Sequence, residues 1–416
     1  MPQEAGLWQN IEQKTRQIFH HYNYKEIRTP IFEETELFAK SMGQTSEVVQ
    51  KQMLNIASQK TAEASEAQLS GLSLRPEGTA AVVRSYLEND LDRKESLTKQ
   101  YYIGPMFRGE RPQKGRLRQF HQIGAEIIGP LAIHPYLDAE IIELCVYIIK
   151  ELGVKEFELQ LNTLGTSKDR ANFSQWLRDK LKNDIKNLDE HLQKSFQENV
   201  FRILDSKDPQ AAALANKLKL DRSYLNKESV QYYEQVKEAL DKLGVRYVEK
   251  PGLVRGLDYY EHTVFEIIAG GLGSQNAVAA GGRYNDLIGM LDTSRKEKIG
   301  GLGFSIGIER VILAGGNTLA PSAEQLDAFV VALGEQAFKT GFKLMFDLRH
   351  NGASCDIGSP AGSMKSQMRQ ANKLGAKQVI IIGEDELKKN VAIVKDMSNS
   401  EQSEIKLEVV INHFKK

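Results

Sequence analysis

The sequence predicts an α+β protein with more than one domain, and three observations support this prediction. Two segments of alternating polarity, 101–108 and 118–128, are typical of paired strands. From about residue 167 to 242 the chain carries long charged stretches with helical spacing and few β-branched runs, which favours a helical insertion. Beyond residue 326, short apolar segments alternate with helical ones, which favours a small α/β domain.

Length and composition exclude several classes of protein. A chain of 416 residues is too long for one ordinary core, and its 55 basic and 55 acidic side chains balance, so a polyanion would have to meet local patches. Cys145 and Cys355 lie far apart, which excludes a disulfide scaffold and fits a reducing compartment. No apolar run approaches the roughly 18 to 20 residues of a membrane span, and the start lacks a signal-peptide pattern. We therefore expect a cytoplasmic protein with no membrane segment.

The first hundred residues predict a helix, an edge strand, a surface loop and a turn that carries two charged side chains. Apolar residues over 7–22 recur at helical spacing, and IRTPIFEE then predicts an edge strand interrupted by Pro30. The polar segment 59–71 has little to bury and predicts a flexible surface loop. The stretch LSLRPEGTAAVVRSYLE predicts a strand, a turn and a helix, with Arg75 and Glu77 at the turn.

The predicted hairpin between residues 99 and 129 has a basic connection. Residues 109–117 carry one acid, Glu110, and three cations, namely Arg111, Lys114 and Arg116. A phosphate-rich ligand could bind there, because the cations gather on one short loop. A charged turn without a ligand explains the same pattern, so both interpretations stay open at this point.

The returning strand of the hairpin carries polar side chains on one face. A two-residue period points Gln122, Gly124 and Glu126 to the same side, together with Arg118 and Phe120. An amide and a carboxylate then flank a glycine gap, and such a face could hold a small polar molecule. The alternative is a half-solvated strand of an antiparallel sheet.

The segment GLVRGLDYYEHTVFEI places an arginine and two tyrosines before a predicted strand. The guanidinium of Arg255 could stabilise charge that develops on a phosphorus centre, and the hydroxyls of Tyr259 and Tyr260 could orient a polar group. By composition alone, a loop that simply enters a strand explains the segment equally well.

Two further glycine-rich segments follow. Gly281 and Gly282 precede Arg283 and Tyr284, which permits either close approach to a ligand or a tight turn. The stretch GGLGFSIGIER lacks the G-x-G-x-x-G spacing, so we reject a dinucleotide fold. SIGIERVIL predicts a helix, and Arg310 within it is better explained as a cation stacked on a ligand than as a solvated charge.

Other familiar chemistries leave no pattern in the chain. The eight histidines show no H-x-x-x-H spacing, and His121 alone is more typical of a hydrogen-bonded strand residue, so we assign no metal ligands. Neither a Walker A string nor a G-x-S-x-G elbow occurs. Nucleotide chemistry in this protein would therefore depend on arginines.

Five segments in order resemble the signature set of histidyl-tRNA synthetases: LRPEGT, YYIGPMFRGERPQKGRLRQFHQIGAE, LVRGLDYYEHTVFE, GGRYNDL and GLGFSIGIER. RGLDYY and GGRYNDL resemble the two histidine-specific peptides of that family, while FRGER and GIER resemble motifs 2 and 3 of class II aminoacyl-tRNA synthetases. The resemblance implies a class II catalytic domain on an antiparallel sheet over residues 1–320, with the helical insertion at about 167–242. It also implies a C-terminal α/β anticodon-binding domain over residues 326–416.

The resemblance implies roles for four arginines. Arg108 would bind the α-phosphate of ATP, Arg310 would stack on the adenine, and Arg116 would touch ATP or the acceptor end of tRNA. Arg255 would lie opposite Arg108 across the α-phosphate, in a role that other class II enzymes give to a metal ion. Magnesium would accompany the ATP phosphates, with no metal bound by the protein itself.

The resemblance also implies a histidine pocket and a reaction. The pocket would be lined by Glu77, Thr79, Gln122, Glu126, Tyr259 and Tyr260. The two tyrosines would contact the imidazole, and Glu126 would pair with one of its nitrogens. The reaction would convert histidine and ATP to histidyl-adenylate and pyrophosphate, and then transfer histidine to tRNA(His). The family further implies a homodimer, although Met1-Pro2 replaces its usual Arg-Gly start, so we expect an N-terminal interface strand to be missing.

Two other functions remain as alternatives. One is the regulatory subunit of ATP phosphoribosyltransferase, which is similar to the synthetase catalytic domain and binds histidine without catalysis. The intact RGLDYY segment, the nucleotide arginines and the C-terminal α/β domain argue against it. The other is a tRNA-binding module without activation chemistry, for which Arg108, Arg255 and Arg310 would be dispensable.

Overall fold

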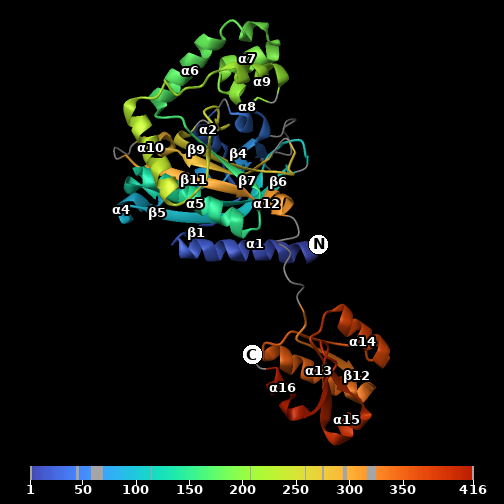
Figure 1. The fold of residues 1–416 in the computed structure, drawn as a ribbon. Coiled ribbons are helices and arrows are strands. Elements are labelled where there is room, and N and C mark those ends of the chain that lie inside the picture. Colours follow the sequence, from blue (N-terminus) through green and yellow to red (C-terminus); the bar gives the residue numbers. More distant parts are fainter. Residues whose placement is uncertain are drawn as a thin grey trace, which may run out of the picture. The chain divides into compact units, whose positions relative to one another are not determined.

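The chain forms two units, Met1–Leu319 and Ala320–Lys416, in a computed structural model (Figure 1). The structure describes residues 2–43, 46–57, 69–113, 115–206, 208–257, 259–273, 276–293, 298–315 and 325–414. The loop expected at 59–71 falls largely outside these residues, as does Lys114.

An eight-stranded sheet forms the centre of the first unit, in the order β1-β5-β6-β11-β10-β9-β7-β8. Its strands are β1 (Lys25–Glu26), β5 (Thr98–Phe107), β6 (Gln119–Gly129), β11 (Gly300–Gly307), β10 (Ala277–Arg283), β9 (Glu261–Ala269), β7 (Phe157–Thr163) and β8 (Val248–Glu249). The neighbours are antiparallel except for the two edge pairs, β1 with β5 and β7 with β8. The expected hairpin is the pair β5 and β6, in which Tyr102 lies opposite Gly124.

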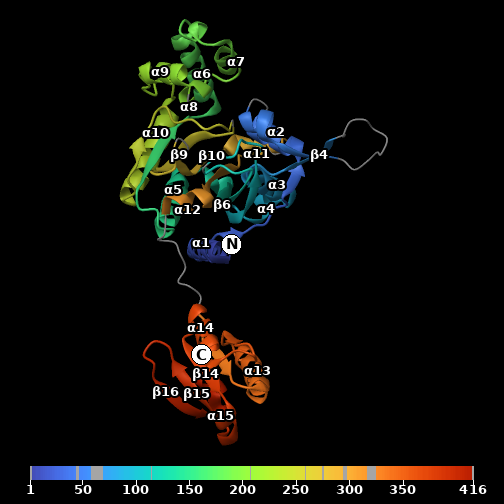
Figure 2. The same ribbon diagram turned by 90° about the vertical axis from the view of Figure 1, so that its right-hand side faces the viewer.

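The two faces of this sheet are covered by different helices, as Figure 2 shows. One face packs on α1 (Pro2–His21), α5 (Pro135–Glu151), α10 (Lys227–Lys242) and α12 (Ile308–Gly315). The other packs on α2 (Thr35–Met42), α3 (Thr79–Glu88) and α11 (Asn285–Leu291). Strand alternation divides the side chains accordingly, because Tyr101 and Ile123 join the first core and Tyr102 and Val264 the second.

Beside α2 and α3 lies a three-stranded sheet in the order β2-β4-β3, with β2 at Phe32–Glu34, β3 at Leu54–Ala57 and β4 at Leu69–Leu74. The edge strand predicted over IRTPIFEE forms only after Pro30, as β2 at the edge of this sheet. β1 ends at Glu26 and β2 begins only at Phe32, in a different sheet. Proline has no N–H to donate to a ladder, and here it marks the passage between two sheets.

The helical insertion has a hydrophobic core of its own. It contains α6 (Ser167–Leu181), α7 (Glu190–Glu198), α8 (Arg202–Asp205) and α9 (Pro209–Lys217), which gather away from the sheet in Figure 1. Their buried side chains run from Phe173 to Leu214. The helix α10 instead buries Tyr233 and Val236 in the core of the main sheet. The separately packed part of the insertion therefore ends before α10, short of the expected residue 242.

The end of the first unit differs from the predicted helix SIGIERVIL. β11 continues through Gly307, and α12 begins at Ile308. Ile306 is paired with Ile123 on one side and Ala279 on the other, so two strand ladders override the helical spacing. Gly281 and Gly282 likewise lie inside β10 and not in a tight turn.

The second unit is a five-stranded mixed sheet in the order β13-β12-β14-β15-β16. Its elements are β12 (Ala328–Ala332), α13 (Glu335–His350), β13 (Cys355–Ile357), α14 (Met364–Lys373), β14 (Gln378–Ile382), α15 (Glu384–Lys389), β15 (Val391–Asp396), β16 (Gln402–Lys406) and α16 (Val410–His413). Ile380 and Ile382 join one core and Val379 and Ile381 the other, so β14 is buried on both faces. The α/β prediction for this unit is confirmed.

Short helices complete the part of the chain that the structure describes: α4 (Leu91–Lys94), the π-helical turn Val48–Gln52, and the 3₁₀ turns Pro130–Ile133, Ile185–Asn187 and Leu407–Val409.

Candidate active site

A cavity of about 330 Å³ in the first unit collects most of the side chains singled out from the sequence. Ten residues have predicted catalytic, ATP-binding or histidine-binding roles, and nine of them line the cavity: Glu77, Thr79, Arg108, Arg116, Gln122, Arg255, Tyr259, Tyr260 and Arg310. They come from separate elements, including the turn into α3, the connection and the second strand of the β5–β6 hairpin, the loop before β9, and α12. The tenth, Glu126, has no exposed surface and lies behind Thr79, to which it is hydrogen-bonded.

Glu126 is the centre of a buried hydrogen-bonded cluster. Its carboxylate accepts hydrogen bonds from Thr79 Oγ1 at 2.7 Å, from the Tyr284 hydroxyl at 2.5 Å and from the Tyr102 hydroxyl at 3.5 Å. Burial raises the pKa of Glu126 to about 8, although the hydrogen bonds from Tyr284 and Thr79 act in the opposite direction. This end of the cavity therefore holds a carboxyl group that carries or shares a proton near neutral pH.

Glycines create the space for this cluster. A Cβ at Gly303 would lie 1.7 Å from Glu126 Oε2, and a Cβ at Gly124 would lie 2.1 Å from the ring of Tyr102. The glycine gap in the predicted face of β6 is thus filled from within the protein by Tyr102. The same packing explains why this face is buried at Gln122, Gly124 and Glu126, whereas Arg118 at its start is exposed.

Glu77 holds the start of α3. Its carboxylate accepts hydrogen bonds from the backbone N–H groups of Thr79 at 2.7 Å and Ala80 at 2.9 Å. A carboxylate at a helix N-terminus satisfies N–H groups that have no partner within the helix. Burial nevertheless raises its pKa. Glu77 therefore organises the turn while one side of it faces the cavity.

Gln122 brings an unsatisfied acceptor to the cavity. Its amide nitrogen donates to Ser305 Oγ at 3.4 Å, whereas Oε1 is buried and accepts no hydrogen bond from the described residues. The rings of Tyr259 and Tyr260 lie nearby, with centroids 4.6 Å apart. A buried acceptor without a donor is costly, so this wall suits a ligand that supplies an N–H group.

Three arginines meet at the other end of the cavity. Arg108 Nε donates to Pro76 O at 3.0 Å, and Arg310 donates to Gly115 O at 3.0 Å and to Ala277 O at 2.6 Å. Burial, followed by the positive charges of Arg116 and Arg108, lowers the pKa of Arg310. Cations that destabilise one another in this way form a site that an anion would stabilise.

Arg255 is the fourth cation, and it is paired with an acid that also lines the cavity. Its Nη1 lies 2.7 Å from Glu266 Oε1, while its buried Nε has no acceptor among the described residues. Burial acts to lower the pKa of Arg255, but the Glu266 carboxylate, together with Tyr260 and Asp205, outweighs it and the pKa is raised. The guanidinium is thus held charged, with a donor left for a ligand.

Sequence reasoning missed several contributors to the site. Tyr102 and Tyr284 hold Glu126, Glu266 pairs with Arg255, and Glu309 accepts a hydrogen bond from the His121 N–H. Only Tyr102 could have been found from the sequence. The hairpin register places it opposite Gly124, and the absence of a side chain there leaves room for a large ring. The others depend on contacts between distant segments.

Two family models match the chain, one within each of its two units. A family model described as histidyl-tRNA synthetase matches residues 1–311. The chain belongs to the histidyl-tRNA synthetase family. A second model, described as an anticodon binding domain, matches residues 327–416.

Histidyl-tRNA synthetase relatives align over the whole chain. The histidine–tRNA ligase of Bacillus cytotoxicus is 43% identical, and that of Halothermothrix orenii 41%, with 100% of this chain and 96% and 97% of those proteins covered. The apo histidyl-tRNA synthetase of Staphylococcus aureus superimposes with a TM-score of 0.80 at 36% identity, covering 100% of this chain and 97% of that one. A Bacillus halodurans protein described as an ATP phosphoribosyltransferase regulatory subunit/histidyl-tRNA synthetase has a TM-score of 0.62 at 21% identity over 92% of this chain and 96% of that one, which shows the fold alone.

Proposed function

We propose that the protein is a histidine–tRNA ligase that activates histidine with ATP and transfers it to tRNA(His). The supporting observation is a single cavity with a buried carboxyl–tyrosine cluster at one end and an arginine cluster at the other. The histidine carboxylate would attack the α-phosphorus of ATP, and the bond to pyrophosphate would break. The terminal ribose hydroxyl of the tRNA would then attack the carbonyl carbon of the adenylate, releasing AMP.

The carboxyl–tyrosine end is assigned to the amino acid. Glu126 would pair with an imidazole nitrogen through the Thr79 hydroxyl that it holds at 2.7 Å, and its pKa of about 8 lets it take up or release a proton near neutral pH. The unpartnered Gln122 Oε1 would accept from the ammonium group. Tyr259 and Tyr260 would flank the ring, while Glu77 and Thr79 would form the wall behind it.

The arginine end is assigned to ATP. Arg108 and Arg255 would contact the α-phosphate from opposite sides, and the free Nε of Arg255 supports this role. Arg310 would stack against the adenine, and Arg116 would contact the phosphates or the acceptor end of tRNA. Catalysis would then consist of fixing the nucleophile in line and neutralising charge on the phosphate, with little covalent chemistry for the protein.

Magnesium would enter with the nucleotide. No group of three or more His, Cys, Asp or Glu side chains suited to a metal occurs among the described residues. Glu266 and Glu309 line the cavity near the arginines, and one or two carboxylates beside phosphate oxygens are a typical Mg²⁺ environment. The ion would neutralise charge on the leaving pyrophosphate.

The proposal extends to partners and compartment. The unit that contains residues 327–416 would bind the anticodon region of tRNA(His), and the enzyme would act as a homodimer in the cytoplasm. Both cysteines are free and buried, which fits a reducing compartment. None of the described helices has the length and apolarity that a bilayer crossing requires.

ATP–pyrophosphate exchange measured with each amino acid tests the function. We expect exchange with histidine alone, because other side chains would leave the buried polar groups of the pocket unpaired. Equal exchange with another amino acid would contradict the assignment. Histidine binding without any exchange would instead favour the regulatory-subunit alternative.

A further inference from the structure

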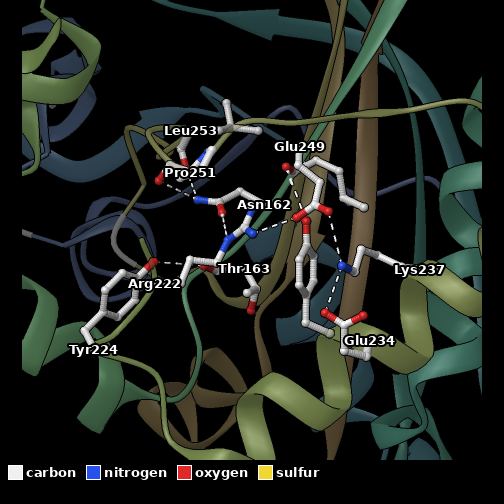
Figure 3. A network of polar contacts seen from close by, with 11 residues as sticks. Asn162, Thr163, Arg222, Tyr224, Glu234, Lys237, Glu249, Pro251 and Leu253 are labelled. Atoms are coloured by element: carbon white, nitrogen blue, oxygen red, sulfur yellow. Dashed lines mark hydrogen bonds and ion pairs between the residues drawn. The ribbon is translucent and has the colours of Figure 1, made fainter. Parts of the chain in front are cut away.

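A buried asparagine fixes the base of the loop that carries Arg255. Asn162 lies in β7 with no exposed surface. Its Nδ2 donates to two backbone carbonyls, Pro251 O at 3.1 Å and Leu253 O at 2.9 Å (Figure 3). Because only one residue separates Leu253 from Arg255, these bonds determine where the loop leaves the sheet.

Arg222 determines which way the Asn162 amide points. Its Nε donates to Asn162 Oδ1 at 3.2 Å, and its Nη1 donates to Glu249 Oε2 at 2.6 Å (Figure 3). A guanidinium can only donate hydrogen bonds, so it selects the amide orientation in which Oδ1 faces Arg222 and Nδ2 faces the loop. The opposite orientation would place oxygen against oxygen at Pro251 and Leu253.

The backbone at Arg222 indicates that its side chain is needed. Arg222 has a φ of 59°, in the left-handed region that glycine and asparagine occupy at lower cost. The side chain is held by Glu249 and lies over the ring of Tyr233, with 4.9 Å between guanidinium carbon and ring centroid. A simple turn would not require this combination.

The same segment belongs to the packed core of the helical insertion. Tyr224 stacks on Phe173 with centroids 4.1 Å apart, and its hydroxyl donates to Thr163 O, next to Asn162, at 3.3 Å. A Cβ at Gly252 would lie 3.4 Å from Leu220 Cδ1, so this segment also lies close to the loop itself. The segment 220–224, through which the chain leaves the helical insertion, is thus in contact with the base of the loop that carries Arg255.

We propose that Asn162 and Arg222 are positioning residues for Arg255, through which the helical insertion sets the geometry of adenylate formation. The inference rests on the proposed function, in which Arg255 contacts the α-phosphate. Neither residue is among those that line the cavity, so both act through the loop backbone. A displacement of about 1 Å in a charge-stabilising group can cost about 100-fold in rate.

Single-turnover adenylate formation in variants tests the proposal. Asn162→Ala and Arg222→Gly should lower the rate by roughly 10 to 100-fold with a much smaller change in the KM for ATP, because the lost contact acts in the transition state. Lys237→Met is the matched control. It removes the ion pairs of Lys237 with Glu234 and Glu249 in the same network (Figure 3), leaves Asn162 bonded, and should leave the rate unchanged.

Two readouts separate positioning from stability. In an Arg255→Ala background, the further change Asn162→Ala should lower the rate of adenylate formation by less than about twofold. The reason is that the effects of coupled residues are not additive. Arg222 is 19% exposed, and its change to glycine relieves the backbone, so the melting temperature should change little while the rate falls. Multiplicative losses in the double variant would overturn the proposal, as would a wild-type rate in Arg222→Gly. A wild-type protein without histidine-dependent exchange would overturn the proposed function and this inference with it, whereas an active wild type with unaffected variants would overturn the inference alone.

Discussion

Buried charges divide the cavity into two ends with opposite demands on a ligand. Burial raises the pKa of Glu77 and Glu126, whereas burial and mutual repulsion lower that of Arg310. A carboxyl held partly protonated can share a proton with a weak base, and a cluster of cations is stabilised by a polyanion. Arg255 differs from both groups, because Glu266 keeps it charged and anchored.

Arg255→Ala should lower the single-turnover rate of adenylate formation by about 100 to 1000-fold, the range typical of losing one preorganised charge-stabilising donor. Arg255→Lys should rescue poorly, because a point charge cannot reproduce a planar contact that is held by Glu266 on one edge. Histidine affinity, measured by titration, should change far less. Near-normal chemistry in the alanine variant would remove Arg255 from the mechanism.

The pH dependence of stability should report on Glu126. Its pKa is raised from 4.5 to about 8 in the folded state, so the folded protein binds more protons than the unfolded chain between these values. The free energy of unfolding should therefore fall as pH rises through this window, by at most about 1.4 kcal/mol per pH unit. Urea titrations from pH 5 to 9 should show Glu126→Gln losing this slope. Parallel curves for the two proteins would show that Glu126 titrates normally.

At the scale of elements, the sheet and its helices are joined by buried polar contacts as well as by apolar packing. Arg283 in β10 is fully buried, and its guanidinium pairs with Asp138 in α5 and donates to Ala132 O at 2.7 Å. Asp138 also accepts from the Tyr232 hydroxyl in α10 at 2.7 Å. This cluster connects the segment GGRYNDL to two helices on the opposite face from Tyr284.

Asp138→Ala should lower the free energy of unfolding by about 3 to 5 kcal/mol, because it removes the carboxylate that pairs with the buried Arg283 charge. Glu140 offers a control on the same helix. Its pair with Lys99, at 2.5 Å, is partly exposed, and such pairs contribute about 0 to 1 kcal/mol. Equal losses in Asp138→Ala and Glu140→Gln, measured by chemical denaturation, would contradict this ranking.

At the scale of the whole molecule, the two units have separate cores. The hydrophobic cores of the eight-stranded sheet and of the helical insertion lie within Met1–Leu319, and those of the five-stranded sheet lie within Ala320–Lys416. Every described residue that lines the cavity belongs to the first unit. If the proposed function is right, we therefore expect truncation to separate adenylation from tRNA recognition.

A chain that ends at Leu319 should keep measurable histidine-dependent exchange and lose most of its capacity to charge tRNA(His), since the phosphate chemistry needs no residue beyond that point. Aminoacylation with the full-length protein as the reference checks this prediction. Circular dichroism would confirm that the shortened chain is folded. Undiminished charging by it would contradict the division of labour.

The sequence by itself determined the β5–β6 hairpin, the α/β character of the second unit and, through the ordered motifs, nine of the residues that line the cavity, because periodicity and motif order are local properties. Prediction from the sequence failed at Ile306, where pairing with two neighbouring strands overrides the helical spacing. It also failed where a residue acts through a partner far away in the sequence. Glu266, Asn162 and Arg222 carry no local signal, since their roles arise from chain segments that fold beside them. Tertiary structure alone decided which charges are buried together, because desolvation depends on the whole surroundings of a group and not on its neighbours in sequence.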